Sequence, residues 1–161
     1  RTIISSMRRI PQIALVLLLF LVGTAQAQDR SAALRTFYHT LPDLPVTELQ
    51  KAADCEERLL AGLAALELHR RTQSADYATD AARAFSAALK ADRNDPWAHF
   101  GLGLTLTRAR KTMAIVRASG AADGEAALVA KRSFEKAIQL DPSFDEVTDA
   151  YIELRDVKEI R

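Results

Sequence analysis

Two stretches of the chain share one pattern: AARAFSAALKAD (residues 81–92) and AKRSFEKAIQLD (residues 130–141). Each places Ala, Phe, Ala and Asp at the spacing A-x3-F-x2-A-x3-D, and the second copy begins 49 residues after the first. Residues three and four apart lie on one face of an α-helix. Each copy therefore predicts a helix that packs through one apolar stripe and ends at its Asp.

This pattern resembles the second helix of a tetratricopeptide (TPR) repeat, in which a small residue, an aromatic, an Ala and a terminal Asp-Pro mark the helix and its exit. The second copy ends in Asp141-Pro142, whereas the first has Arg93 in place of Pro. Leu102-Gly103 and Leu106 stand where the family places Leu-Gly and then a large residue. The resemblance covers roughly residues 57–160, although the family repeat is about 34 residues long.

The resemblance implies an all-α fold, a TPR-like α-α superhelix of antiparallel helix pairs. Stacking is needed because one helix pair cannot bury its own apolar stripe. The residues expected to pack the helices together are Ala81, Phe85, Ala88, Leu102, Gly103, Leu106, Ala130, Phe134, Ala137 and Pro142.

The N-terminal residues have the composition of a targeting segment. Met7-Arg8-Arg9 precedes a continuous apolar run, residues 13–22, and Ala25-Gln26-Ala27 follows it, as is typical of a secretory signal peptide cleaved after Ala27. The alternative is an uncleaved anchor, but a spanning helix needs ~20 apolar residues. We expect residues 1–27 to be upstream residues and signal peptide, and the mature protein to be periplasmic or secreted, touching the membrane only before cleavage.

The mature chain divides into two parts. Residues 28–46 predict a short helix over 29–39 and a linker broken by Pro42 and Pro45. Residues 47–161 form the predicted repeat domain, with helices over 47–69, 76–91, 97–117, 124–140 and 144–161. The starts are marked by capping boxes, Thr47 with Gln50 and Ser143 with Glu146, and by the cap residues Asp95 and Asp123.

The sequence stops within the last predicted helix. Either this helix covers the end of the array, or the sequence is a fragment of a longer protein, which is the interpretation that we favour.

Charge and residue usage exclude several function classes. Residues 29–161 hold 19 basic and 21 acidic residues, so a general nucleic-acid binder is not expected. Cys55 is the one cysteine, which excludes an internal disulfide. His39, His69 and His99 lie in different predicted helices without metal-ligand spacing. We predict a non-catalytic protein with no cofactor and no metal.

A binding surface follows from the resemblance, because the first helices of TPR pairs line a concave groove. In this chain the implied groove residues are Trp97, Phe100, Leu104, Thr107 and Arg108, followed by Glu146, Asp149, Glu153 and Asp156 on the last helix. The four carboxylates share one helical face. They suit an extended or helical peptide that carries Lys or Arg, whereas the simpler interpretation is a solvated face of a terminal helix.

The sequence favours an exported, non-catalytic scaffold that mediates protein–protein or protein–peptide interaction. The alternative is the helical N-terminal region of a larger exported enzyme whose catalytic domain lies beyond Arg161. A third interpretation is self-association, in which the last helix completes its stack against a neighbouring copy.

Overall fold

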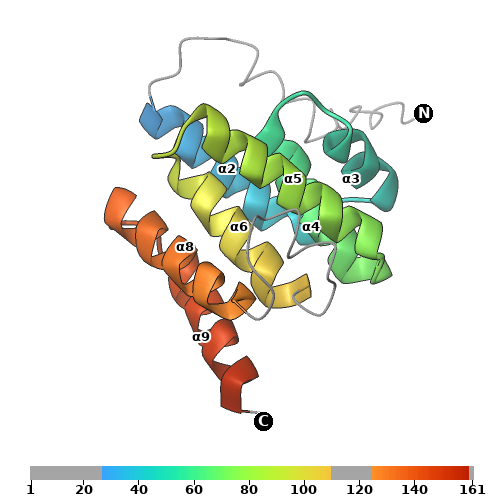
Figure 1. The fold of residues 1–161 in the computed structure, drawn as a ribbon. Coiled ribbons are helices and arrows are strands. Elements are labelled where there is room, and N and C mark those ends of the chain that lie inside the picture. Colours follow the sequence, from blue (N-terminus) through green and yellow to red (C-terminus); the bar gives the residue numbers. More distant parts are fainter. Residues whose placement is uncertain (1–26, 110–124, 160–161) are drawn as a thin grey trace, which may run out of the picture.

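The computed structural model describes residues 27–109 and 125–159, and this part of the chain is all-helical, with no strand. Its elements, shown in Figure 1, are α2 (Ala27–Thr40), the 3-10 turn η1 (Leu41–Asp43), α3 (Val46–Ala53), α4 (Arg58–Thr72), α5 (Ala75–Ala91), α6 (Pro96–Ala109), α8 (Ala126–Leu140) and α9 (Glu146–Glu159). The all-α prediction is confirmed. All but the last residue of the predicted signal segment, the extension of the helix from Trp97 past Ala109, and the cap Asp123 fall outside the described residues.

Two helices form the centre of the fold. In α4 every residue from 59 to 69 is buried, and in α6 every residue from 97 to 107 except His99 is buried. A helix that is buried on all sides must be covered by neighbours all round. Accordingly, α4 packs against α3, α5 and α6, and α6 packs against α5, α8 and α9.

The two signature phenylalanines pack onto glycines of these central helices. Phe85 on α5 lies against Gly62 and Gly101, so closely that a Cβ at Gly62 would come within 2.8 Å of its ring. Phe134 on α8 lies against Gly103, where a Cβ would come within 2.5 Å. Both rings are fully buried. The glycines therefore allow each outer helix to approach the central helix through an aromatic ring.

The residues of the repeated pattern are buried as expected. Nine of the predicted packing residues are buried, namely Ala81, Phe85, Ala88, Leu102, Gly103, Leu106, Ala130, Phe134 and Ala137. Pro142 differs, because it is exposed in the turn before α9.

The terminal Asp of each copy builds the same turn. Asp92 Oδ1 accepts a hydrogen bond from the Asn94 N–H at 2.9 Å, and Asp141 Oδ1 accepts one from the Ser143 N–H at 3.0 Å. The N–H of each Asp also closes its helix, on the carbonyls of Ala88 and Ala137. These Asx-type bonds explain why both copies end in Asp, whether or not Pro follows.

The predicted helix over 47–69 is broken in the structure. It ends at Ala53 and restarts at Arg58. Glu57 caps the new start, since its carboxylate accepts the Leu60 N–H at 2.8 Å. The predicted capping box at Thr47 is wrong, because Pro45 is the N-cap and no side chain caps α3.

The start of the last helix also differs from the prediction. Helix α9 begins at Glu146 rather than at Phe144. The Ser143 hydroxyl donates to Asp141 at 2.6 Å, so it serves the turn before the helix and not a capping box with Glu146.

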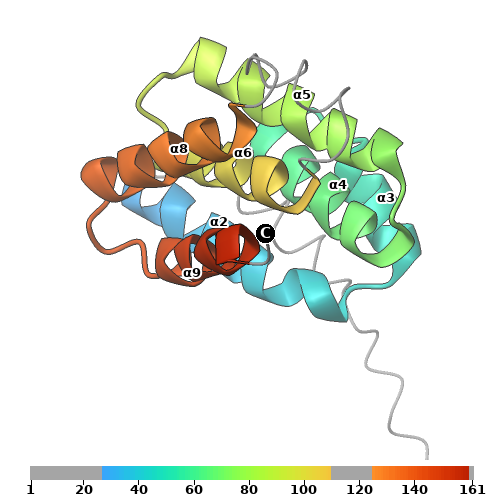
Figure 2. The same cartoon turned by 60° about the horizontal axis from the view of Figure 1, so that its bottom comes forward.

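Helix α2 lies across the remaining side of the central helices. Figure 2 shows α2 and α9 on one side of α6, with α5 on the other. Leu34 and Phe37 of α2 are each 1% exposed and belong to the same core as α4 and α6. Helix α2 is thus an integral part of the folded core.

Candidate functional site

The surface that α2 covers, termed here the α2 seat, combines aromatic rings with acidic helix starts. Its rings are Trp97, Phe100 and Phe144, which pack on one another with centroids 4.5 to 5.7 Å apart. Tyr38 of α2 adds an edge contact to Phe100, at 5.4 Å between centroids. The Trp97 Nε1–H donates to Ser31 Oγ at 3.0 Å, so the one buried indole donor is satisfied by α2.

One arginine of α2 joins the starts of both central helices. Arg30 donates to Glu57 at 3.1 Å and to Asp95 at 3.3 Å. Glu57 is the N-cap of α4, and Asp95 holds the start of α6 by accepting the Ala98 N–H at 3.0 Å. Arg30 therefore neutralises two carboxylates that already face the positive ends of two helix dipoles.

The third acidic helix start belongs to α9. Glu146 is 9% exposed, and its Oε1 lies 2.8 Å from Arg35 Nε and 3.1 Å from His39 Nε2. The Arg35 Nε–H forms no hydrogen bond with it, and Glu146 Oε2 has no hydrogen-bond partner among the described residues. Arg35 also donates to the Ser143 carbonyl at 3.2 Å and lies over the Phe144 ring. The hydrogen bonds of His39 with Glu146 and of Arg35 with Ser143 therefore hold this corner together with charge and the stacking of Arg35 on Phe144.

The predicted groove residues of α6 are placed differently from the prediction. Trp97, Phe100, Leu104 and Thr107 are between 0% and 4% exposed, so none of them lies in an open groove. The cause is α2, which covers Trp97 and Phe100 with its own side chains. Arg108 differs from these four, because its side chain is exposed and lines a pocket.

The acidic face of the last helix is only partly described. Glu146 is buried against α2 and so does not lie on an open acidic face, which corrects the prediction for this residue. Asp149 is exposed. The side chains of Glu153 and Asp156 lie outside the described part of the chain, so an acidic stripe there stays a prediction.

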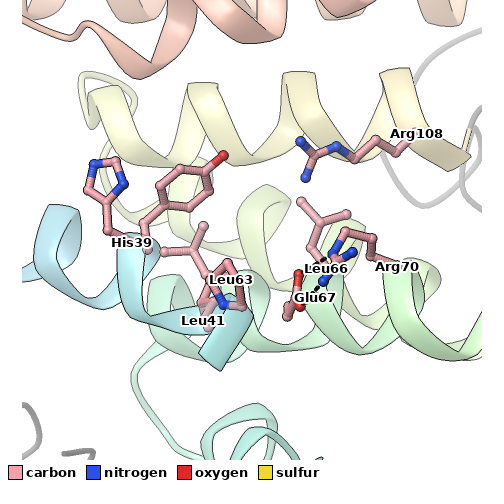
Figure 3. A pocket seen from close by; sticks show the side chains of 9 residues that line it. His39, Leu41, Leu63, Leu66, Glu67, Arg70 and Arg108 are labelled. Atoms are coloured by element: carbon pink, nitrogen blue, oxygen red, sulfur yellow. Dashed lines mark hydrogen bonds and ion pairs between the residues drawn. The ribbon is translucent and has the colours of Figure 1, made fainter. Parts of the chain in front are cut away.

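A pocket opens beside the end of α2, where the chain turns through η1 (Figure 3). Its volume is about 180 Å³. The apolar walls come from η1 and α4, and polar groups from α2, α4 and α6 complete it. The lining residues are Tyr38, His39, Leu41, Pro42, Leu63, Leu66, Glu67, Arg70 and Arg108.

Glu67 holds the polar wall of this pocket together. Arg70 binds it through two hydrogen bonds of 2.7 Å, and Arg71 adds a third of 2.7 Å. Burial raises the pKa of Glu67, but the bonds and charges of the two arginines outweigh burial and hold the pKa below its usual value. Glu67 is therefore an ionised, structural carboxylate at neutral pH.

Arg71 connects this carboxylate to the turn after α2. Its guanidinium donates to the carbonyls of Leu41, Pro42 and Leu44 at 2.7 to 2.8 Å. These carbonyls belong to a turn that has two prolines and few internal hydrogen bonds. Sequence reasoning missed this network, since its partners are about 30 residues apart and no local motif marks them.

Cys55 lies in the turn between α3 and α4 and is half-buried. Burial raises the pKa of its thiol, and the S–H donates to the Glu57 carbonyl at 3.4 Å. In residues 27–109 and 125–159, no group of three or more His, Cys, Asp or Glu side chains is arranged to hold a metal ion. None of the helices described is both long and apolar enough to cross a bilayer.

Comparison of the chain with protein-family models, with curated proteins and with solved structures finds no match.

Proposed function

We propose that this chain is an exported, non-catalytic interaction module with TPR-like helix pairs, and that its α2 seat recognises an amphipathic helix with a basic edge. The observation that carries the proposal is the pairing of Arg30, Arg35 and His39 with acidic residues at the starts of α4, α6 and α9. One edge of α2 is basic, and its other edge inserts Leu34 and Phe37 into the core. In this proposal α2 is the chain's own helix bound in the α2 seat.

The recognition chemistry agrees with the partner expected from the sequence, a protein or peptide that carries Lys or Arg. Helix-in-groove binding uses apolar anchors three, four and seven residues apart, with charges that fix the orientation. Leu34, Phe37 and Leu41 have this spacing and are all buried. A partner helix of the same design would compete with α2 for the seat.

The proposal is tested with a labelled peptide of residues 27–41, which carries all three anchors, and two forms of the whole chain. In the wild-type chain α2 fills the seat, so the peptide should bind weakly. Phe37→Ala weakens α2 docking, and we expect it to raise the affinity for the added peptide by about tenfold or more. Fluorescence anisotropy measures this binding.

Two control peptides define the chemistry. A peptide with Arg30→Gln and Arg35→Gln removes the basic edge, and one with Phe37→Ala removes an anchor; both should bind the Phe37→Ala chain about tenfold more weakly. If that chain keeps its helical circular dichroism and still fails to bind the wild-type peptide, the seat does not recognise a helix in the proposed way.

The export part of the proposal depends on residues 7–27 alone. Expression with this leader in an exporting host, followed by N-terminal sequencing of the mature protein, tests it. A mature protein that begins at Gln28 is expected, whereas a product retained with its full leader would contradict export.

A further inference from the structure

We propose that His39 and Glu146 form a proton-operated latch, which holds α2 in its seat when His39 is protonated and loosens it when His39 is neutral. The inference rests on the proposed function, since it describes how access to the α2 seat is regulated. His39 lies in the last turn of α2, and Glu146 is the first residue of α9. The latch therefore joins two residues that lie 107 positions apart in the chain.

The contact between these two side chains depends on the state of the imidazole. His39 Nε2 lies 3.1 Å from Glu146 Oε1. In a neutral ring Nε2 donates in only one of the two tautomers, whereas both nitrogens donate in a protonated ring. The protonated ring also adds a positive charge opposite the carboxylate. Histidine side chains ordinarily gain or lose this charge between pH 5 and 8, so acidification across this range should tighten the contact.

Glu146 offers a carboxylate that water screens little. Its side chain is 7% exposed, against 62% for His39. It lies at the start of α9, where a helix dipole favours negative charge. Arg35 Nε is 2.8 Å from the same oxygen but forms no hydrogen bond there, and Glu146 Oε2 has no partner among the described residues. The carboxylate can therefore still gain from a second cation.

The other charges around His39 do not replace this pair. On α2 itself, Arg35 is a second cation beside Glu146 and opposes the protonation of His39 in part. Figure 3 shows the charged lining residues of α4 and α6 at the other end of the pocket from His39. They are Glu67, Arg70 and Arg108. The acid among them is already paired with an arginine at 2.7 Å. The Tyr38 ring, 5.6 Å from that of His39, is a phenol, and phenols ordinarily titrate near pH 10.

The experiment measures hydrogen exchange of the whole chain between pH 5.5 and 8, where ordinary carboxylates are ionised. Protection factors compare each rate with that of an unstructured chain, which removes the intrinsic dependence of exchange on pH. We expect the protection of the α2 amides to fall about threefold to fivefold as the pH rises, since a pair with one exposed member is modest in strength. The amides of buried α4 report opening of the whole fold and serve as the internal reference.

Three variants locate the latch. His39→Gln removes the charge and should hold the protection of α2 at its low value at every pH. His39→Arg keeps a positive charge and should hold it at the high value, also at pH 8. The side chain of His39 is mostly exposed, so neither change should unfold the protein. His99→Gln is the matched control, because His99 contacts the Arg93 carbonyl and not α9, and it should respond to pH as the wild type does.

Three results would overturn the inference. One is a change of protection that is equal in the α2 and α4 amides, which would mean that α2 opens only with the whole fold. The others are a pH response that persists in His39→Gln and one that persists in His39→Arg. The exchange measurement uses no added peptide, so failure of this latch and failure of the seat to bind a helix are separate results.

Discussion

Gly103 shows how a single missing side chain sets the distance between two helices. The Phe134 ring occupies the space that a Cβ at this position would need. An Ala at a helical Gly position ordinarily stabilises a helix by about 0.5–1 kcal/mol. At Gly103 the Phe134 ring would have to move to admit a Cβ. The packing cost therefore opposes the gain in helix propensity.

We predict that Gly103→Ala destabilises the protein by about 1–3 kcal/mol, because overpacking outweighs the gain in helix propensity. Urea unfolding measures the change. The double variant Gly103→Ala with Phe134→Leu provides the control, since a smaller side chain at 134 should remove part of the added cost. A stabilised single variant, or fully additive losses, would show that Gly103 and Phe134 do not share this space.

Glu67 gives a pH-dependent prediction. Its folded-state pKa lies below the usual 4.5, so the carboxylate contributes stability above the pKa of the unfolded chain. That contribution is lost as the pH falls through the lower, folded-state value. Urea unfolding of wild type and Glu67→Gln should therefore differ most near neutral pH and converge only as the pH falls below the lowered, folded-state pKa of Glu67.

The control for this titration is Glu48→Gln, which removes a carboxylate paired with one exposed lysine. Surface pairs of this kind contribute at most about 1 kcal/mol. If the difference for Glu67→Gln stays constant down to pH 3, the Arg70 and Arg71 pairing does not stabilise the ionised form.

At the scale of elements, the sequence of α6 already indicates that this helix is buried and does not line an open groove. Residues 97–107 include Trp, Phe, three Leu and two Gly with few polar residues, and a helix that is apolar on all sides is buried on all sides. This signal argues against an open groove at Trp97 and Phe100. The prediction followed the family resemblance instead, and α2 fills the space.

Other element boundaries could be predicted because their signals are local. Asp92, Asp95 and Asp141 act on N–H groups two or three residues away, and these turns and starts are where the sequence placed them. The break between Ala53 and Arg58 has no Gly or Pro. Its cap, Glu57, is held by Arg30 from a distant helix, and such a tertiary contact leaves no local pattern.

The turn after α2 gives the prediction at this scale. We expect Arg71→Gln to cost about 2–3 kcal/mol, because it leaves the carbonyls of η1 and part of Glu67 without their charged donor. Hydrogen exchange should rise chiefly at the amides of Leu41, Asp43 and Leu44. Arg70→Gln keeps the bonds to η1 and is the control; equal exchange in the two variants would contradict a specific role for Arg71.

At the scale of the whole molecule, α2 joins parts of the chain that are far apart in sequence. It reaches the starts of α4, α6 and α9 through basic residues, and the core through Leu34 and Phe37. The sequence predicted a short amphipathic helix at this place and an acidic surface on the last helix. It could not predict that the two meet, because residues 39 and 146 are 107 positions apart and carry no pairing signal.

The last prediction concerns the loss of this helix from its seat. Phe37→Ala removes a fully buried ring and should cost about 3–5 kcal/mol. Trp97 is the one tryptophan and its indole bonds to α2, so its emission should shift to the red as α2 loosens. Ile152→Ala, on an exposed apolar residue of α9, is the control and should change neither stability nor emission. If Phe37→Ala lowers stability while the emission of Trp97 stays that of a buried indole, α2 remains seated without its anchor, and the polar contacts of Arg30, Arg35 and His39 suffice to hold it.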